Sequence, residues 1–248
     1  MNLHILCTSC LTPNTSISVA ISEFNQRLEQ TKASLLKLRS LSKSPDITIF
    51  ICDISSHQAT LRLYYYCIAH LPPWIKIKPL LLFINARNVE LCTSLGKGYS
   101  EYLMLQCYYD HLSTLHPKSC PDFIVKVGAR SLPTNLHQLL SLLTIFRAQR
   151  FFAYSDNRFS ICETRCFALK PSVLGSFLNS SHIKHLNDAN HFYIEHALYA
   201  FAKDSLLSTY PIPFIPFYTS LISGSCGTLI NENIYFKALK YLFFGQIK

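Results

Sequence analysis

The sequence is poor in charged residues, because Asp, Glu, Lys and Arg make up only 15% of its 248 residues. Acidic residues are the scarcer kind: 14 Asp and Glu stand against 23 Lys and Arg, for a formal net charge of +9. This balance favours anionic partners such as nucleotide sugars, nucleic acid or an anionic membrane surface. Hydrophobic residues make up 49%, so the chain can bury the core of one ordinary domain.

Long apolar runs are also lacking. The longest stretches, Pro79–Ile84 and Leu139–Phe146, fall well short of the roughly 20 residues that cross a membrane. The N-terminus has neither a charged n-region nor a proper apolar h-region, so we expect no signal peptide. These features predict a cytoplasmic protein without a transmembrane helix.

The ten cysteines lack the spacing of a metal site or a disulfide framework. Cys7 and Cys10 form the one CxxC pair, and Cys162-x-x-x-Cys166 has no matching histidine pair. Most of the others lie among apolar neighbours. We therefore expect reduced thiols that behave as small buried hydrophobes.

Strand-like and helix-like segments alternate along the chain, which favours an α/β fold with a parallel or mixed sheet covered on both faces. No GxGxxG sequence is present, so a dinucleotide-binding fold is poorly supported. Strands are predicted at 3–8, 46–52, 80–84, 122–127, 151–155 and 162–169. Helices are predicted at 17–40, 56–70, 96–115, 135–148, 171–178, 191–203 and 234–244.

Five short polar motifs interrupt this hydrophobic background. They are Lys97-Gly98-x-x-Glu101, Lys126-Val-Gly-Ala-Arg130, Glu163-Thr-Arg165, Ile194-Glu195-His196 and Ser223-Gly-Ser-Cys-Gly-Thr228. With the opening Glu23-x-x-x-Arg27 and Asp53-Ile-Ser55, their order resembles a family of bacterial glycosyltransferases that build capsule and lipopolysaccharide chains. The chain departs from the family pattern at Gly128, Ala129 and Cys226, and has Glu163 in place of Asp.

The resemblance implies a single GT-A-like (Rossmann-like) α/β domain over residues 1–248, with a central mixed, mainly parallel sheet flanked by helices. Residues 1–130 would bind the nucleotide sugar and residues 131–248 the acceptor. The implied reaction moves a hexose to a growing cell-surface polysaccharide or lipid-linked glycan, with inversion the expected outcome. No cofactor is implied, and because the sequence contains no Asp-x-Asp, we expect no metal requirement.

The resemblance also implies a set of donor-binding residues, and each has an ordinary structural alternative. Cations and helix-terminal amides suit phosphate, and a carboxylate after the second strand suits the nucleoside. The alternatives are a helix cap for Asp53, a solvated Lys/Arg pair and ordinary glycine loops. The donor-binding set is Asp53, Lys97, Gly98, Lys126, Arg130, Arg165, Ser223, Gly224 and Gly227.

An inverting transfer needs a carboxylate to accept the proton of the acceptor hydroxyl. Glu195, at the start of a predicted helix, is the expected base, although it also suits an ordinary helix surface. Glu101 and Glu163 are the two competing carboxylates.

Two other classes of function stay open. The charge of +9 and the aromatic content also fit a nucleic-acid-binding protein, but the basic residues are scattered and form no recognised module. The departures at Gly128, Ala129 and Cys226 leave room for an inactive scaffold of a polysaccharide assembly complex. The aromatic and basic segment 235–244 predicts peripheral association with the inner face of the cytoplasmic membrane, unless that helix is part of the core.

Overall fold

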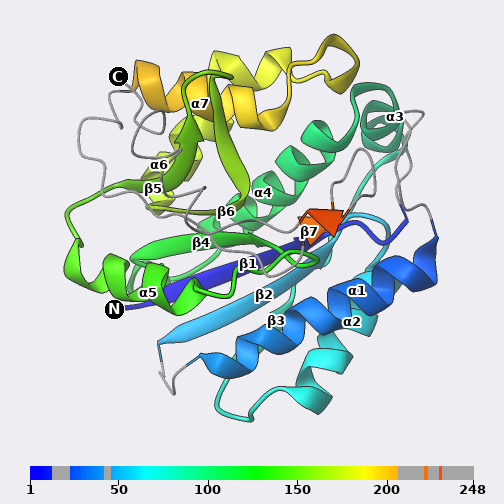
Figure 1. Ribbon diagram of the computed structural model, residues 1–248, viewed down its shortest axis with the longest axis vertical. Helices are drawn as coiled ribbons and strands as arrows, with labels where there is room; N and C mark the ends of the chain where they lie inside the picture. The colour runs from blue at the N-terminus through cyan, green and yellow to red at the C-terminus, as the bar shows by residue number, and fades with distance from the viewer. Residues whose placement is uncertain (13–22, 42–45, 206–220, 223–228, 231–248) are drawn as a thin grey trace.

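A six-stranded mixed sheet forms the centre of the computed structural model, which describes residues 1–12, 23–41, 46–205, 221–222 and 229–230 (Figure 1). Its order is β3-β2-β1-β4-β6-β5, in which the first four strands are parallel, β6 is antiparallel to both of its neighbours, and β5 runs in the same direction as the first four. The predicted α/β class with a mixed, mainly parallel sheet is confirmed. The strands are β1 Leu3–Ser9, β2 Ile47–Asp53, β3 Lys76–Pro79, β4 Phe123–Gly128, β5 Phe151–Asp156 and β6 Ile161–Leu169. Short strands β7 Leu221–Ile222 and β8 Leu229–Ile230 form a separate antiparallel pair.

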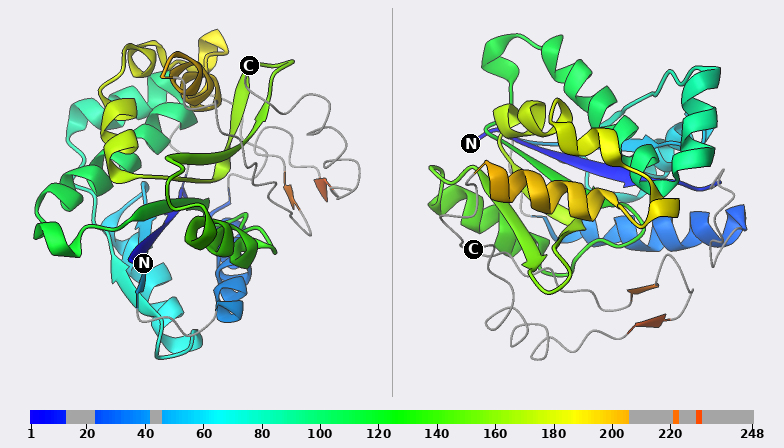
Figure 2. Two further views of the ribbon diagram at one scale, coloured as in Figure 1. Left: turned by 90° about the vertical axis from the view of Figure 1, so that its left-hand side faces the viewer. Right: turned by 90° about the horizontal axis from the view of Figure 1, so that it is seen from above.

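Helices cover both faces of the sheet (Figure 2). Buried residues of α1 (Phe24–Leu35), α2 (His57–His70) and α5 (Leu136–Ile145) form one core cluster with one face of the sheet. Buried residues of α4 (Lys97–Ser113), α6 (Pro171–Leu178) and α7 (Ile194–Asp204) form a second cluster on the other face. The remaining helix is α3 (Ala86–Leu95), and the 3-10 turns are η1 Leu36–Ser40, η2 Pro117–Ser119, η3 Ser181–His185 and η4 Asp188–Asn190.

Strand β1 is buried along its whole length and joins the two cores. Successive side chains of a strand point to opposite faces. Leu3, Ile5 and Cys7 accordingly lie in the first cluster, whereas Leu6 lies in the second. A strand that is apolar on both faces needs cover on both, and the two helical layers provide it.

One sequence prediction in the first half, the position of the third strand, is wrong. The strand expected at 80–84 lies earlier, at Lys76–Pro79. Its residues alternate between exposed and half-buried at the edge of the sheet, so the sequence there has no apolar run that would indicate a strand. The segment 80–85 is irregular and leads into α3, which was not predicted. The helix expected over 17–40 is described only from Phe24 and tightens into the 3-10 turn η1 after Leu35.

Several predictions fall outside the described residues. They are the proline-rich segment 210–216, the glycine loop 223–228 with Ser223, Gly224 and Gly227, and the helix at 234–244. Within the described ranges, no helix is both long and apolar enough to span a bilayer. Nine of the ten cysteines lie in those ranges as free thiols, six of them buried, as expected for small hydrophobes.

His4 on β1 is a buried polar residue within the second core. Its Nδ1 lies 2.7 Å from the hydroxyl of Tyr108, and its ring contacts Phe50. Burial lowers the pKa of His4 to about 4, with the charges of Lys78 and His111 adding to the effect. His4 is therefore neutral near pH 7.

This depressed pKa predicts a loss of stability in mild acid. Below pH 6.5 the unfolded chain takes up a proton at His4 that the folded chain takes up only near pH 4. The free energy of unfolding should therefore fall over this window by up to about 3 kcal/mol from His4 alone. Urea unfolding at several pH values should show a shallower decline for His4→Gln than for the wild type. His70→Gln, at an exposed position, should leave the decline unchanged, and equal slopes in all three proteins would contradict this assignment.

Candidate functional site

The carboxyl ends of the parallel strands lie together at one edge of the sheet. Ser9 of β1 pairs in register with Asp53 of β2, and Thr8 pairs with Gly128 of β4. The amide of Ala129, just past β4, donates to the carbonyl of Thr8 at 2.8 Å. Ligands of α/β proteins bind outside this edge. The loops that follow these strands therefore define the candidate site.

Asp53 supports the loops at this edge from inside. Its carboxylate is 1% exposed and accepts the amides of Leu11 at 3.0 Å and Ser55 at 2.8 Å. Burial raises the pKa of Asp53, while hydrogen bonds from Ser9 and Ser55 oppose the shift. Both carboxylate oxygens accept backbone amides, so Asp53 ties the loop after β1 to the loop after β2. The nucleoside contact predicted for Asp53 stays a prediction.

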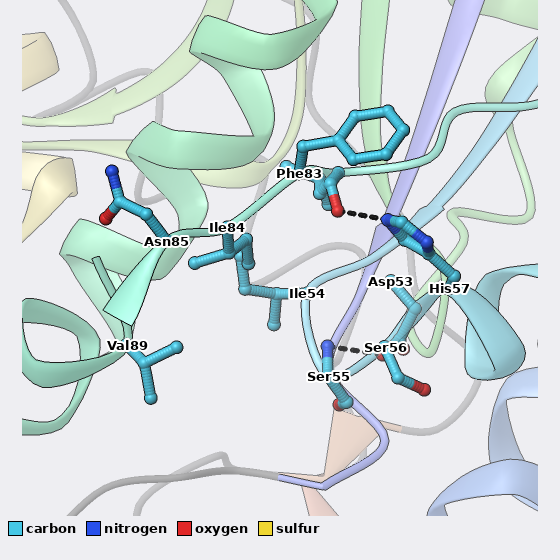
Figure 3. Close-up of a pocket in the computed structure, with 10 residues that line it drawn as sticks. Asp53, Ile54, Ser55, Ser56, His57, Phe83, Ile84, Asn85 and Val89 are labelled. Atoms are coloured by element: carbon cyan, nitrogen blue, oxygen red, sulfur yellow. Dashed lines mark hydrogen bonds between the residues drawn. The ribbon is translucent and has the colours of Figure 1, made fainter. Parts of the chain in front are cut away.

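A pocket of about 470 Å³ opens beside Asp53, between the loop after β2 and the segment before α3 (Figure 3). Phe83 is 87% exposed at its rim, and its ring meets the ring of His57 edge to face at 4.9 Å. The ring of His57 also bonds the carbonyl of Leu82. Two helices begin at the pocket, capped by Ser56 and Asn85. The pocket thus combines an exposed aromatic face with two helix N-termini, which carry partial positive charge.

Two arginines lie next along the edge, near the ends of β1 and β4. Arg27 of α1 is 7% exposed and donates to the carbonyl of Cys10 at 2.8 Å. Burial lowers the pKa of Arg130, and the positive charge of Arg27 lowers it further. Within the described part of the chain, the Arg130 side chain has no hydrogen bond or ion pair to a protein group. Two neighbouring guanidinium groups of this kind suit an anion that accepts several hydrogen bonds.

Arg27 was quoted in the sequence motif but not predicted as a site residue. Its helical period places it on the buried face of α1, where an arginine is expensive unless it has partners. The sequence signal that could have identified Arg27 as a site residue is its place among the buried positions of the predicted helix.

The Glu163-Thr-Arg165 motif lies beside the end of β4. The Arg165 backbone would contact a side chain added at Gly128, at 3.8 Å. Arg165 pairs with Glu163 through two bonds of 2.5 Å. This bidentate pair occupies both side chains, so Glu163 is less suited than Glu195 to act as the base. The donor-binding role predicted for Arg165 stays untested.

Lys126 and Glu101 are buried against each other, which differs from the ligand contacts expected for them. The Lys126 ammonium group is 2.5 Å from the Glu101 carboxylate and also donates to the Thr164 carbonyl. Lys126 is 2% exposed and Glu101 6%. The pair joins α4 to β4 inside the second core. Side chains of β4 alternate between the two faces of the sheet, and the Lys126 side chain points to the face that this core covers.

The carboxylate of a protein side chain, Asp188, lies at the N-terminus of α4. The amides of Lys97 and Gly98 donate to the carboxylate of Asp188 in η4, from Lys97 at 2.7 Å. A Cβ at Gly98 would lie 2.9 Å from that carboxylate, so glycine permits the close approach. In this structure Asp188 occupies the place that was expected to take phosphate.

Glu195 differs from the other two carboxylates. It is half-buried in the first turn of α7, and its Oε1 accepts the Thr164 hydroxyl at 3.0 Å. No cation pairs with it among the described residues. Glu195 is therefore the candidate carboxylate that is best placed to accept a proton.

Four of the five motifs thus meet in space, in two groups. Glu101, Lys126, Thr164 and Glu195 form one hydrogen-bonded series, and Lys97 and Gly98 adjoin it through Asp188. Arg130 lies apart from this series, near Arg27. Within the described ranges, no group of three or more His, Cys, Asp or Glu residues is arranged to hold a metal ion.

No protein-family model and no curated protein sequence matches this chain. Among solved structures, mouse xyloside xylosyltransferase 1 in its apo form is similar over 80% of this chain and 79% of its own, at 11% identity and a TM-score of 0.45. A cytidylyltransferase from Leptospira borgpetersenii is similar over 98% and 88%, at 9% identity and a TM-score of 0.46. Residues 1–349 of S. aureus TarS are similar over 71% of this chain and 49% of their own, at 10% identity and a TM-score of 0.38. Because these TM-scores lie below 0.5, the functional conclusions rest on the residues of the site.

The buried ion pair makes a prediction about stability. Lys126→Met leaves the Glu101 carboxylate buried without its partner, which should lower the free energy of unfolding by about 3–5 kcal/mol. The double variant Lys126→Met with Glu101→Gln removes both charges and should recover part of this loss. Urea unfolding measures both, with Lys97→Met at an exposed position as the control. A loss below about 0.5 kcal/mol for Lys126→Met, the range of ordinary surface changes, would contradict a buried pair.

Proposed function

We propose that this protein is a glycosyltransferase that moves a sugar from a nucleotide-sugar donor to a hydroxyl of a glycan or a lipid-linked acceptor. One observation carries the proposal, namely the order of groups along the carboxyl edge of the sheet. The pocket with Phe83 lies by β2, the arginine pair by β1 and β4, and Glu195 by β6. A nucleotide sugar presents its parts in the same order: nucleoside, diphosphate and sugar.

The spacing of the strands supports this assignment. From β2 to β6 there are three strand-to-strand steps of about 4.8 Å, or roughly 14 Å in all. An extended nucleotide sugar can bridge such a span. The exposed ring of Phe83 offers a stacking surface for a base, and stacking on an aromatic side chain tolerates any base.

Arg27 and Arg130 would bind the diphosphate. When the bond to the anomeric carbon breaks, negative charge develops on the departing nucleoside diphosphate, and guanidinium groups nearby stabilise it. Arg130 contributes donors that have no protein acceptor in the described part of the chain. This assignment replaces Lys126, whose donors are already used inside the core.

Glu195 would act as the general base. Its carboxylate accepts the proton of the acceptor hydroxyl while the hydroxyl oxygen attacks the anomeric carbon and the diphosphate leaves from the opposite side. Direct displacement of this kind inverts the anomeric configuration. The resemblance of the motifs to capsule and lipopolysaccharide glycosyltransferases supports a cell-surface glycan as the acceptor.

The donor site predicts the effect of Arg130→Ala. A thermal-shift panel of nucleoside diphosphates and nucleotide sugars should identify a stabilising ligand, since a ligand at about 100 times its dissociation constant adds roughly 2.7 kcal/mol. Arg130→Ala should weaken binding of that ligand by about 10–100-fold, because hydrogen bonds to charged groups contribute about 1.5–3 kcal/mol. Arg150→Ala, a control at an exposed arginine, should bind as the wild type does.

The same assay tests the expected independence from metal. Affinity should persist in EDTA, because cations of the protein stand where a metal would neutralise phosphate. Loss of binding on chelation, restored by manganese or magnesium, would contradict this. Equal affinity in the Arg130→Ala variant and the wild type would remove the arginine pair from the donor site.

The proposed role of Glu195 as the general base leads to a second prediction. Glu195→Gln keeps the shape of the side chain but removes its basicity, so transfer should fall by roughly 10²–10⁴-fold while donor affinity persists. Glu163→Gln should retain most of its turnover, since Glu163 pairs with Arg165. Transfer to added glycan acceptors, with donor binding measured in each variant, decides between them. Normal turnover in Glu195→Gln would eliminate this base.

We also propose reversible association with an anionic membrane. On α2 and the turn that follows it, Tyr65, Ile68 and Trp74 are 62%, 52% and 44% exposed. Arg62 and Lys76 are exposed nearby in sequence, and α2 contains no Asp or Glu. Aromatic and basic groups together suit the surface of a bilayer with anionic lipids.

This surface should sediment with anionic vesicles at low salt and be released at high salt, because a weak apolar contact needs the charge attraction to hold. Replacing Tyr65 and Trp74 with Ser should reduce the bound fraction. Phe159→Ser, at an exposed aromatic on the β5–β6 turn, is the control. Protein that stays in the supernatant with anionic vesicles at low salt would refute membrane association.

A further inference from the structure

Thr164 lies at the centre of the hydrogen-bonded series that joins the motifs. It is 1% exposed, and its hydroxyl donates to Oε1 of Glu195 over 3.0 Å. This hydrogen bond fixes the direction of the Glu195 carboxylate, because it holds one of the two carboxylate oxygens.

The backbone of Thr164 is itself held in place. Its carbonyl accepts the Lys126 ammonium group, which in turn pairs with Glu101 at 2.5 Å. The series therefore alternates negative and positive groups. The Glu101 carboxylate contacts the Lys126 cation, the Lys126 cation contacts the Thr164 carbonyl oxygen, and the Thr164 hydroxyl donates to the Glu195 carboxylate. Each contact is favourable, and three of the four members are buried.

An irregularity in the sheet makes this arrangement available. Ala153 of β5 pairs with Phe167 of β6, and Ser155 pairs with Cys162, so two steps along β5 match five along β6. Extra residues in a bulge leave the regular ladder, and their side chains and carbonyls can turn to other partners. Thr164 lies inside this bulge and faces α7 with its hydroxyl.

We propose that Thr164 is the positioning residue of the catalytic base: its hydroxyl holds the Glu195 carboxylate aimed at the acceptor hydroxyl, and the buried Lys126–Glu101 pair anchors the Thr164 peptide. This inference rests on the proposed function of Glu195. The bulge in β6 is then part of the site, because it presents one threonine to α7 with its hydroxyl and to Lys126 with its carbonyl.

Other ionisable groups lie on the elements packed against α7, which are β6, α4 and η3. Glu163 pairs with Arg165, and His182 pairs with Asp204. On α7 itself, Nδ1 of His196 accepts the amide of Tyr193. The further groups are Lys97 with Asp188, and Lys184 and His185 of η3. Among the described residues, the Thr164 hydroxyl donates to Glu195 and to none of these groups, so its removal tests the contact with Glu195.

The test uses Thr164→Val, which keeps the branched shape and removes the hydroxyl, and Thr164→Ser, which keeps the hydroxyl. Thr164→Val should lower kcat about tenfold, the effect of one hydrogen bond to a charged group, with donor KM unchanged. Thr164→Ser should restore the wild-type kcat.

A second measurement needs no turnover. In protein labelled with ¹³C at the glutamate carboxyl carbons, the Glu195 signal is identified by its loss in Glu195→Gln. Its chemical shift at a fixed pH should move in Thr164→Val, because the carboxylate loses the hydrogen bond from the Thr164 hydroxyl, and should return in Thr164→Ser. If Thr164→Val does not fold, Thr164→Ala provides a second side chain without the hydroxyl.

The outcomes separate the two ideas. An unchanged kcat and an unchanged Glu195 signal in Thr164→Val, while Glu195→Gln abolishes transfer, would overturn the role of Thr164 alone. Full turnover in Glu195→Gln would overturn the proposed base and with it this inference. A loss of kcat shared equally by Thr164→Val and Thr164→Ser would show that packing, not the hydroxyl, is responsible, and would also overturn it.

Discussion

The buried pair between Lys126 and Glu101 is the interaction on which the rest of the site depends. It joins β4 to α4 across the second core, and a third contact, to the Thr164 carbonyl, brings in β6. Two opposite charges in a core are tolerated only when their hydrogen-bonding groups are satisfied. That requirement fixes the relative positions of three elements, and through Thr164 it reaches Glu195 on α7.

The edge of the parallel strands supplies the other half of the site by a different principle. Asp53 holds the loops after β1 and β2 together through backbone amides, which frees the space beyond them for a pocket. Arg27 and Arg130 lie near each other past the ends of β1 and β4, the two strands between β2 and β6 in the sheet. In the proposed function the donor lies across strands of one sheet, whereas the proposed base, Glu195, comes from helix α7, which contacts the buried pair through Thr164.

The fold was predictable in outline because its signals are local. Apolar runs at the positions of β1, β2 and β4 identified buried strands, and the alternation of strands with helices indicated the α/β class. Helix α3 and the short edge strand β3 were not predicted. For β3 the reason is that an edge strand exposed on one side has a sequence pattern like that of a loop. The motifs could also be recognised from the sequence, but the hydrogen bonds and ion pairs between residues of different motifs could not.

The sequence by itself determined which polar residues interrupt the core, and hence that Glu101, Lys126, Arg130 and Glu195 needed an explanation. Only the tertiary structure decided what each of them contacts. Lys126 and Glu101 face each other across 25 positions of sequence, Asp188 reaches the amides at Lys97 and Gly98, and Arg27 lies near Arg130. The physical reason is that burial and pairing of charge depend on contacts between distant segments, which periodicity and composition do not encode.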